Sequence, residues 1–289
     1  MINQSVLMSD PEYIGIAGIN AYENVRHGPR KDTALQQFAG IQAALREAGI
    51  TITQVPSPIG CQDGVYTANW GVTFQGKALL SRLPNARQAE EAYALGILED
   101  LGFQIRRPSD VFSGQGDTLI FNDHEAILGH GYRTKLTTEL IDHFKWLGIT
   151  PIPVQAKPQR RFGLWKVKNH ISGLYDSYYY DIDLAVAVIA PNVLAVCLDA
   201  LTADGRRAIR ELEARSVNPV TVIPVSEHEA QHGFACNTVS TGETVVMASG
   251  APQLKAELER RGYRVLTAVN DEFKLTGGGI RCVSLTLNK

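Results

Sequence analysis

The sequence LAVAVIAPNVLAVCL, from Leu184 to Leu198, contains two short apolar segments separated by Pro191-Asn192. A Pro-Asn pair between valine-rich segments favours a turn between two strands, so this sequence predicts a hairpin. A helical pattern follows over residues 203–214, and the apolar segment VTVIPV follows at 220–225. These four elements form one strand-strand-helix-strand module.

The same order of elements recurs along the chain. Further helical patterns lie at 32–48, 86–102, 135–147 and 252–262. Short apolar segments, which favour strands, flank them: SVLM (5–8), ITITQVP (50–56), VTFQGKALL (72–80), FQIRRP (103–108), TLIF (118–121), AILGHG (126–131), ITPIPVQ (149–155), ETVVMA (243–248), YRVLTAV (263–269) and RCVSLTL (281–287). No long Gly/Ser linker interrupts the pattern. The sequence therefore predicts an α/β fold of four or five modules, in a single domain over residues 1–289.

Composition and charge exclude several classes of protein. Of 289 residues, 44% are hydrophobic and 20% are charged, which excludes disordered and collagen-like chains. The 28 Lys and Arg residues nearly balance the 30 Asp and Glu residues, so the net charge of −2 favours neither nucleic acid nor a membrane as partner. No apolar stretch is long enough to span a membrane, and the sequence MINQSVLMSD lacks the pattern of a secretory signal. The expected location is the cytoplasm.

Two kinds of motif match cofactor-binding patterns only in part. HEAQH at 228–232 fits the HExxH pattern of zinc proteases, but Pro224 and Gly233 leave room for about two helical turns. SGQGD (113–117) and GGG (277–279) lack the Lys-Ser/Thr of a phosphate loop and the spacing of a dinucleotide-binding turn. We therefore expect a polar loop or short helix at 228–232, and neither a metal nor a cofactor. A zinc protease stays an alternative that bound zinc would support.

The four cysteines contain no CxxC pair, so neither a zinc knuckle nor a dense disulfide framework is expected. Cys282 differs from the others because it follows the triple glycine, where the backbone can approach another group closely. A cysteine there is either a nucleophile that a substrate can reach or a buried apolar residue, and residue types alone do not decide. Cys61, Cys197 and Cys236 are interpreted as structural thiols.

Six segments of the chain resemble, in order and in spacing, the guanidino-group-modifying enzymes. They are CQDGVYTANWG (61–71), FSGQGDTL (112–119), LGHGYRT (128–134), YYDIDLAVAVIAPN (179–192), GFACNTV (233–239) and EFKLTGGGIRCVSLTL (272–287). This group includes arginine deiminases, dimethylarginine dimethylaminohydrolases and amidinotransferases, and the chain is most similar to the arginine dihydrolase branch. The resemblance covers residues 7 to 287. It implies the pentein fold, a five-bladed α/β propeller with the active site in its central channel.

The resemblance also implies roles for individual residues. Cys282 corresponds to the nucleophile that attacks the central carbon of a guanidinium group, and Asp183 to the acidic residue that pairs with that group. The positions that correspond to substrate-binding residues are Asn20, Asn69, Arg82, Arg133 and Asn237. Asn69 corresponds to the second guanidinium contact, and the others to contacts with the amino-acid end and backbone of the substrate.

Two positions differ from the pattern of the family. Asp181 occupies the position of the catalytic histidine, and Ser113 occupies that of a glutamate that binds the guanidinium group. The general acid and base is then either Asp181, with a raised pKa, or His232, which lies near the GFACN segment. Because serine is neutral and smaller than glutamate, Ser113 leaves room for a modified or less basic group at this position of the substrate site.

We therefore expect a cysteine-dependent hydrolase that acts on a non-peptide C–N bond of a guanidino, amidino or related amino acid. The covalent adduct forms on Cys282, and Asp181 and Asp183 complete the catalytic residues. An amidinotransferase would use the same adduct with an amine in place of water. A pentein that has lost catalysis and only binds a ligand is the third interpretation, because the histidine and the glutamate are replaced. The expected partner is a small amino-acid-like molecule, and a homo-oligomer is left open.

Overall fold

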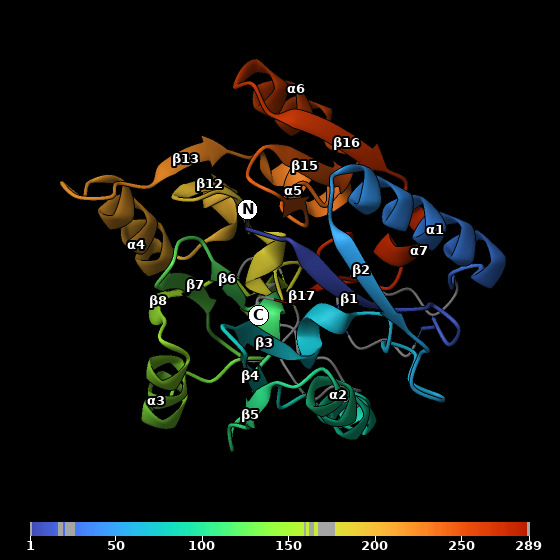
Figure 1. The fold of residues 1–289 in the computed structure, drawn as a ribbon. Coiled ribbons are helices and arrows are strands. Elements are labelled where there is room, and N and C mark those ends of the chain that lie inside the picture. The colour runs from blue at the N-terminus through green and yellow to red at the C-terminus, as the bar shows by residue number, and fades with distance from the viewer. Residues whose placement is uncertain are drawn as a thin grey trace.

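The structure is a computed structural model that describes residues 2–16, 20, 27–158, 160–161, 165–166 and 177–287. The described residues form five three-stranded sheets arranged around a common centre, with helices on the outside (Figure 1). The strand orders are β17-β1-β2, β3-β4-β5, β6-β7-β8, β11-β12-β13 and β14-β15-β16. A further small sheet pairs β9 with β10. The five sheets confirm the upper of the two module counts expected from the sequence.

The elements have the following bounds. The strands are β1 (Ser5–Ser9), β2 (Thr51–Val55), β3 (Gly71–Phe74), β4 (Lys77–Leu80), β5 (Gln104–Arg106), β6 (Thr118–Ile120), β7 (Glu125–Gly129), β8 (Thr150–Val154), β9 (Arg160–Arg161), β10 (Trp165–Lys166), β11 (Val186–Ala190), β12 (Val193–Val196), β13 (Thr221–Pro224), β14 (Val239–Ser240), β15 (Thr244–Ala248), β16 (Arg264–Ala268) and β17 (Leu285–Thr286). The α-helices are α1 (Lys31–Glu47), α2 (Ala89–Asp100), α3 (Thr138–Leu147), α4 (Ala203–Glu213), α5 (Glu227–Gly233), α6 (Pro252–Arg260) and α7 (Asp271–Lys274).

Every three-stranded sheet has the same connectivity. The first strand is antiparallel to the second, a helix follows the second strand, and the third strand returns parallel to it. The crossover helices are α1, α2, α3, α4 and α6. A helix is the usual connection between parallel neighbours, because a short turn cannot return the chain to the starting end of the sheet. One module departs from chain order, since its first strand is β17.

Turn residues explain two of the hairpins. Asn192 has a φ of 57° between β11 and β12, which confirms the predicted turn at Pro191-Asn192. The apolar segment at 72–80 is divided into β3 and β4 by Gln75 and Gly76, with φ values of 48° and 74°. Two consecutive residues with positive φ suit the tight hairpin turn whose twist matches the flanking strands.

Four of the predicted helices are present with shorter bounds, whereas the helix predicted over 32–48 keeps its length and is shifted by one residue. Thr137 and Thr202 cap α3 and α4, and their hydroxyl groups accept hydrogen bonds from backbone N–H groups of the first turn. The predicted helix over 86–102 begins only at Ala89, because residues 85–87 form a 3₁₀ turn. The predicted strand over 281–287 is reduced to β17, so Cys282 lies in a turn before that strand and not at its start.

The two ends of the described chain meet in one sheet. β1 pairs with β17 in antiparallel register, with Val6 opposite Thr286, and this pairing closes the ring of sheets. The first strand of each sheet lies on the inner side, where β17 contacts β3 and β11 contacts both β6 and β14. Hydrophobic clusters fill the space between the sheets and their helices.

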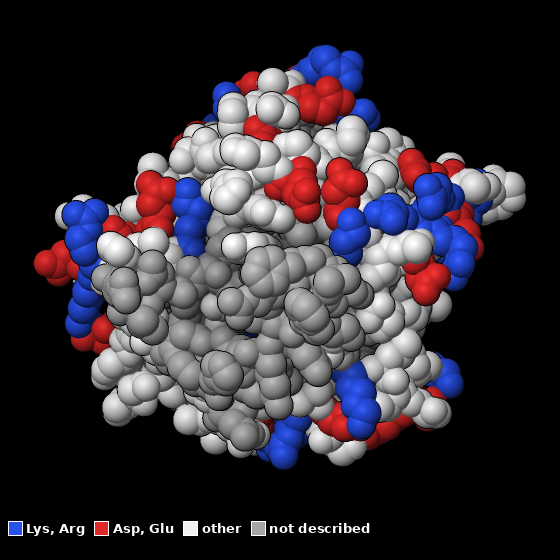
Figure 2. Space-filling model, turned by 180° about the vertical axis from the view of Figure 1, so that it is seen from behind, with Lys and Arg blue, Asp and Glu red and all other residues white. Residues whose placement is uncertain are grey.

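The distribution of charged side chains on the surface agrees with the nearly balanced composition. On the face shown in Figure 2, acidic and basic side chains of the described residues are interspersed around the edge. Among the described helices, none combines the length and the apolar composition that a membrane crossing requires.

Candidate active site

Short 3₁₀ turns lead into three of the inner strands, and four of the nine predicted site residues lie in these turns or directly before them. η1 (Thr67–Trp70) precedes β3, η3 (Gly114–Gly116) precedes β6, and η4 (Ile182–Leu184) precedes β11. Because each turn lies at the same end of its inner strand, side chains from separate modules meet at one end of the channel. Six predicted residues meet there and are buried: Asn69, Ser113, Asp181, Asp183, Asn237 and Cys282.

Asn237 holds the cysteine in place. Its Nδ2 donates a hydrogen bond to Cys282 Sγ at 3.0 Å, and its Oδ1 accepts from the backbone N–H groups of Arg281 at 2.9 Å and Cys282 at 3.1 Å. These three hydrogen bonds of the Asn237 amide are all made with the turn that carries the sulfur. The substrate-binding role of Asn237 stays a prediction, whereas its positioning of the cysteine follows from the geometry.

Asp183 faces the sulfur with one oxygen and leaves the other without a partner. The Cys282 thiol donates to Asp183 Oδ2 at 3.5 Å, while Asp183 Oδ1 is buried without a hydrogen-bond partner among the described residues. Burial, followed by the charge of Asp181, raises the pKa of Asp183 well above its usual value. Burial and the charge of Asp183 likewise raise the pKa of Cys282. A cation placed beside both groups would favour their ionised forms.

Asp181 is held by two neighbours from other modules. Its Oδ1 accepts from Ser113 Oγ at 2.7 Å, and its Oδ2 accepts from Asn69 Nδ2 at 2.8 Å. Gly116 is needed beside this cluster, because a Cβ there would come within 2.6 Å of Asp181 Oδ2. The two positions at which the sequence departs from the family pattern, Asp181 and Ser113, are thus hydrogen-bonded to each other.

Arg87 supports this cluster from behind, and sequence reasoning missed it. Its Nη1 donates to Asn69 Oδ1 at 2.8 Å, and its Nη2 donates to Glu90 Oε2 at 2.7 Å. Its Nε lies 3.7 Å from Asp63 Oδ2. Burial opposes the charge of Arg87, yet Glu90 and Asp63 raise its pKa above the ordinary value. The signal in the sequence is weak, because an arginine three residues before a glutamate is common on exposed helices.

We expect Arg87→Met to destabilise the protein strongly. The change leaves the Glu90 carboxylate buried without its partner, which costs about 3–5 kcal/mol when one member of a buried pair is removed. Urea unfolding should therefore show a large fall in midpoint. Arg207→Met, in an exposed pair with Asp204, is the control and should change stability by less than about 1 kcal/mol. Equal stability of the two variants would contradict a supporting role for Arg87.

Asp117 is a further buried carboxyl that the sequence analysis did not assign. It accepts from the backbone N–H of Ile182 at 2.9 Å, and it lines a cavity of about 190 Å³ together with Arg133 and Tyr180. The Arg133 guanidinium lies 4.1 Å from the ring centre of Tyr180. Burial, followed by the charge of Asp181, raises the pKa of Asp117 to about 7. This cavity is large enough for the main chain of an amino acid.

The raised pKa of Asp117 predicts a pH dependence of stability. Since the folded protein holds this proton up to about pH 7 and the unfolded chain releases it near 3.8, stability falls as pH rises between those values. Asp117→Asn keeps the acceptor for Ile182 and should remove part of that fall, with a gain of about 2–4 kcal/mol above pH 7. Denaturant unfolding across this pH range measures it. Parallel curves for variant and wild type would show that Asp117 is ionised with an ordinary pKa.

Two other predicted residues lie at the edge of the cluster. Asn20 donates to the carbonyl of Thr276 at 2.9 Å, beside the glycines that precede Cys282. Arg82 is partly exposed, and its Nη1 lies 3.4 Å from Glu91 Oε2. The structure therefore brings Asn20 to the glycine segment that precedes Cys282 but gives Arg82 a carboxylate partner of its own. The substrate-binding roles of both residues stay predictions.

The HEAQH motif lies in the short helix α5, which is one of the two structures expected for it, the other being a polar loop. Glu229 accepts from the backbone N–H groups of Gln253 at 2.6 Å and Leu254 at 2.9 Å, so it caps the start of α6. The rings of His228 and His232 lie 5.1 Å apart. Across the described residues, no group of three His, Cys, Asp or Glu side chains is arranged to hold a metal. The carboxylate of the motif is thus engaged in capping a helix.

Comparison with known proteins assigns the family. A family model described as N,N dimethylarginine dimethylhydrolase, eukaryotic, matches residues 16–288. The chain belongs to this family. Membership confirms the resemblance drawn from the six segments, since dimethylarginine hydrolases are among the guanidino-modifying enzymes.

The chain has curated relatives of two kinds within this comparison, both of them enzymes. The bifunctional arginine dihydrolase/ornithine cyclodeaminase AgrE of Nostoc sp. is 29% identical over 267 residues, which cover 91% of this chain and 34% of that protein. The N(G),N(G)-dimethylarginine dimethylaminohydrolase of Mycobacterium tuberculosis is 23% identical over 283 residues, covering 97% and 85%. The chain thus spans about a third of the length of the bifunctional relatives that it matches.

Solved structures of family relatives confirm the pentein fold. The N-terminal domain of the arginine dihydrolase ArgZ, covalently bound to a reaction intermediate, has a TM-score of 0.85 and 25% identity, covering 99% of this chain and 98% of that one. A cysteine variant of AgrE in complex with L-arginine has a TM-score of 0.85 and 26% identity, covering 99% and 40%. The predicted α/β propeller of repeated modules is therefore correct.

Proposed function

We propose that this protein is a cysteine-dependent hydrolase that cleaves a non-peptide C–N bond of a guanidino amino acid or a related amidine. The observation that carries the proposal is the pair formed by Cys282 and Asp183, with a buried Asp183 oxygen free to accept a hydrogen bond. A planar cation with N–H groups fits that oxygen and supplies the positive charge that the pair lacks.

The chemistry follows from this pair. On binding, the cation favours the Cys282 thiolate, whose sulfur forms a bond to the central carbon of the guanidinium group. The C–N bond to the departing amine then breaks, and the amine leaves with a proton. Water attacks the resulting thiouronium carbon, the C–S bond breaks, and the thiol is restored. The covalent intermediate described for ArgZ supports an adduct of this kind.

Asp181 is proposed as the group that exchanges protons with the amine and the water. It lies in the same buried cluster as Asp183, and its hydrogen bonds to Ser113 and Asn69 fix the orientation of its carboxyl. The amino-acid end of the substrate is proposed to occupy the cavity of about 190 Å³ that Arg133 lines, where the guanidinium can bind a carboxylate. Single-domain organisation over residues 1–289, a cytoplasmic location and homo-oligomerisation stay predictions.

The test is product analysis with a substrate panel. Purified protein is incubated with arginine, methylated arginines, hydroxyarginine, citrulline, agmatine and guanidino acids, and ammonia release and product masses are measured. Turnover of one class supports the proposal and names the substrate. Adding amine acceptors separates transfer from hydrolysis, because a transferase gives a new guanidino product. No turnover by protein that still binds panel members would favour a pentein that only binds its ligand.

We expect His232→Ala to retain turnover. The ring of His232 contacts that of His228 on α5, and among the described residues His232 makes no hydrogen bond to the buried cluster. Steady-state kinetics of the variant should give kcat within about twofold of wild type. A loss comparable to that of Asp181→Asn would make His232 the proton-transferring group in place of Asp181.

A further inference from the structure

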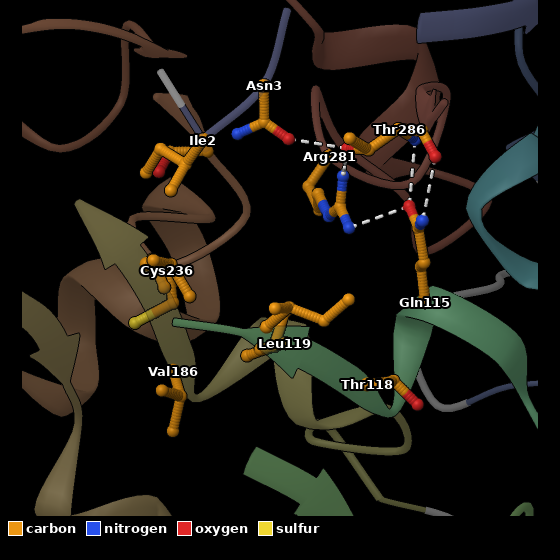
Figure 3. Close-up of a pocket in the computed structure, with 13 residues that line it drawn as sticks. Ile2, Asn3, Gln115, Thr118, Leu119, Val186, Cys236, Arg281 and Thr286 are labelled. Carbon is orange, nitrogen blue, oxygen red and sulfur yellow. Dashed lines mark hydrogen bonds between the residues drawn. The ribbon is translucent and has the colours of Figure 1, made fainter. Parts of the chain in front are cut away.

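A second, smaller cavity lies among the inner strands and is separate from the one that Arg133 lines. Its volume is about 40 Å³, and its walls include residues of β6, β11 and β17. Figure 3 shows it bounded by Asn3 of the N-terminal segment, by Arg281 and Gln115, and by Leu119. Arg281 directly precedes Cys282, and Gln115 belongs to the same turn as Gly116. The cavity therefore lies directly behind the candidate active site.

Among the described residues, Arg281 is the one charged residue that lines this cavity. The residue is 8% exposed, and its guanidinium donates to three neutral acceptors: the carbonyl of Ser284 at 3.3 Å, Thr286 Oγ1 at 2.7 Å and Gln115 Oε1 at 2.8 Å. Within the described part of the chain, no carboxylate lies within 4.0 Å of it. A buried cation with no carboxylate in direct contact is unfavourable, so the cavity wall favours a negative charge.

The hydrogen-bonding groups left over in the wall are able to donate: they are N–H groups of Arg281 and, without a partner among the described residues, the hydroxyls of Thr118 and Thr238. Arg281 has five N–H groups and uses three in the contacts above, which leaves its Nε–H and one Nη2–H. Thr238 also lines the cavity, and its hydroxyl is buried without a hydrogen-bond partner among the described residues. By contrast, Gln115 Oε1 already accepts from both Arg281 and the backbone N–H of Thr286. Free donors beside a buried positive charge select an anion.

We propose that this cavity binds a chloride ion, held by the Arg281 guanidinium and the Thr238 hydroxyl. The size agrees, because about 40 Å³ exceeds the roughly 10–15 Å³ that one water needs but remains far below the volume of a metabolite site. Chloride is a monatomic acceptor and can satisfy several donors at once. Phosphate and sulfate are larger, and we expect them to bind there less tightly.

Chloride at this position is coupled to the active site. The charge of Arg281 lowers the pKa of Asp183, in opposition to burial, and Asp183 and Cys282 in turn favour the charged form of Arg281. A bound anion offsets this charge, so it should favour the protonated forms of Cys282 and Asp183. By reciprocity, ionisation of that pair should weaken chloride binding. Chloride is therefore expected to slow alkylation of the Cys282 thiol by iodoacetamide.

Thermal unfolding and halide diffraction test the site without any assay of turnover. In wild type, sodium chloride titrated against sodium gluconate at constant ionic strength should raise Tm with saturation. Thr238→Val should weaken chloride binding about tenfold, and Arg281→Gln should abolish it. Thr221→Val and Arg210→Gln replace exposed residues of the same types and should leave the wild-type response unchanged.

A crystal soaked in bromide gives an independent measurement. Its anomalous signal should place the ion within hydrogen-bond distance of Arg281. Water in place of bromide at that position, a Tm response without saturation, or an unchanged response in Thr238→Val would each overturn the proposal. Because the bromide experiment uses wild-type protein, the site remains testable if Arg281→Gln does not fold. Chloride binding without turnover would leave this site intact and count against the proposed hydrolase alone.

Discussion

Cys282→Ala should reduce turnover of the guanidino substrate by roughly 10⁴-fold or more, because the group that forms the covalent adduct is lost. The substitution removes one buried sulfur, and the neighbouring Asn237 still anchors the turn through the two backbone N–H groups. The variant should therefore fold and bind substrate. Single-turnover kinetics and mass spectrometry of the intact protein, with wild type trapping an adduct and the variant none, measure the effect.

Cys61→Ala is the matched control. Cys61 is a free, partly exposed thiol that donates a hydrogen bond to the carbonyl of Ile59. This variant should keep wild-type turnover and wild-type adduct formation. If Cys282→Ala retained full turnover, the covalent mechanism would be wrong. If wild type and variant both bound substrate with equal affinity and neither turned it over, the protein would be a binding pentein.

Asp183→Asn should lower kcat/KM by about 10³-fold, equivalent to roughly 4 kcal/mol of lost interaction with the cation. The amide has nearly the same shape but cannot supply the negative charge that the guanidinium group needs. Because burial raises the pKa of Asp183, ionising this carboxyl costs free energy in the folded state. We therefore expect no loss of thermal stability in the variant. Isothermal titration with substrate on the Cys282→Ala background separates binding from chemistry.

Asp199→Asn provides the comparison for charge alone. Asp199 is an exposed residue in a 3₁₀ turn after β12, and its loss changes the net charge by the same amount. Its kcat/KM should stay within about twofold of wild type. A small effect of Asp183→Asn on binding, together with a large effect on kcat, would show that Asp183 acts on the thiol and not on the substrate cation.

Sequence patterns predicted the modules because strands, turns and helices depend on nearby residues. The hairpin at Pro191-Asn192 and the helix over 203–214 are local features, and the structure contains both. The ends of the helices and strands were predicted less accurately than their order. The strand expected over 281–287 shortened to two residues, since the backbone around Cys282 turns to meet Asn237, which is 45 residues away in the sequence.

The resemblance to the family identified the candidate site residues one by one. The tertiary structure decided which of them lie together. Cys282, Asp183, Asp181 and Ser113 come together, while the partly exposed Arg82 pairs with the buried Glu91. Asp117 was part of a quoted motif without an assigned role.

The sequence by itself determined the repeated module and the two departures from the family pattern, because both depend on residue type and local order, and its resemblance to the family made Cys282 the candidate nucleophile. Only the tertiary structure decided that Ser113 and Asp181, 68 residues apart, share a hydrogen bond and that Arg87 stands behind them. It also placed Arg281 beside a cavity without a carboxylate partner among the described residues. Burial and the pairing of charges arise between modules, so spacing along the chain cannot reveal them.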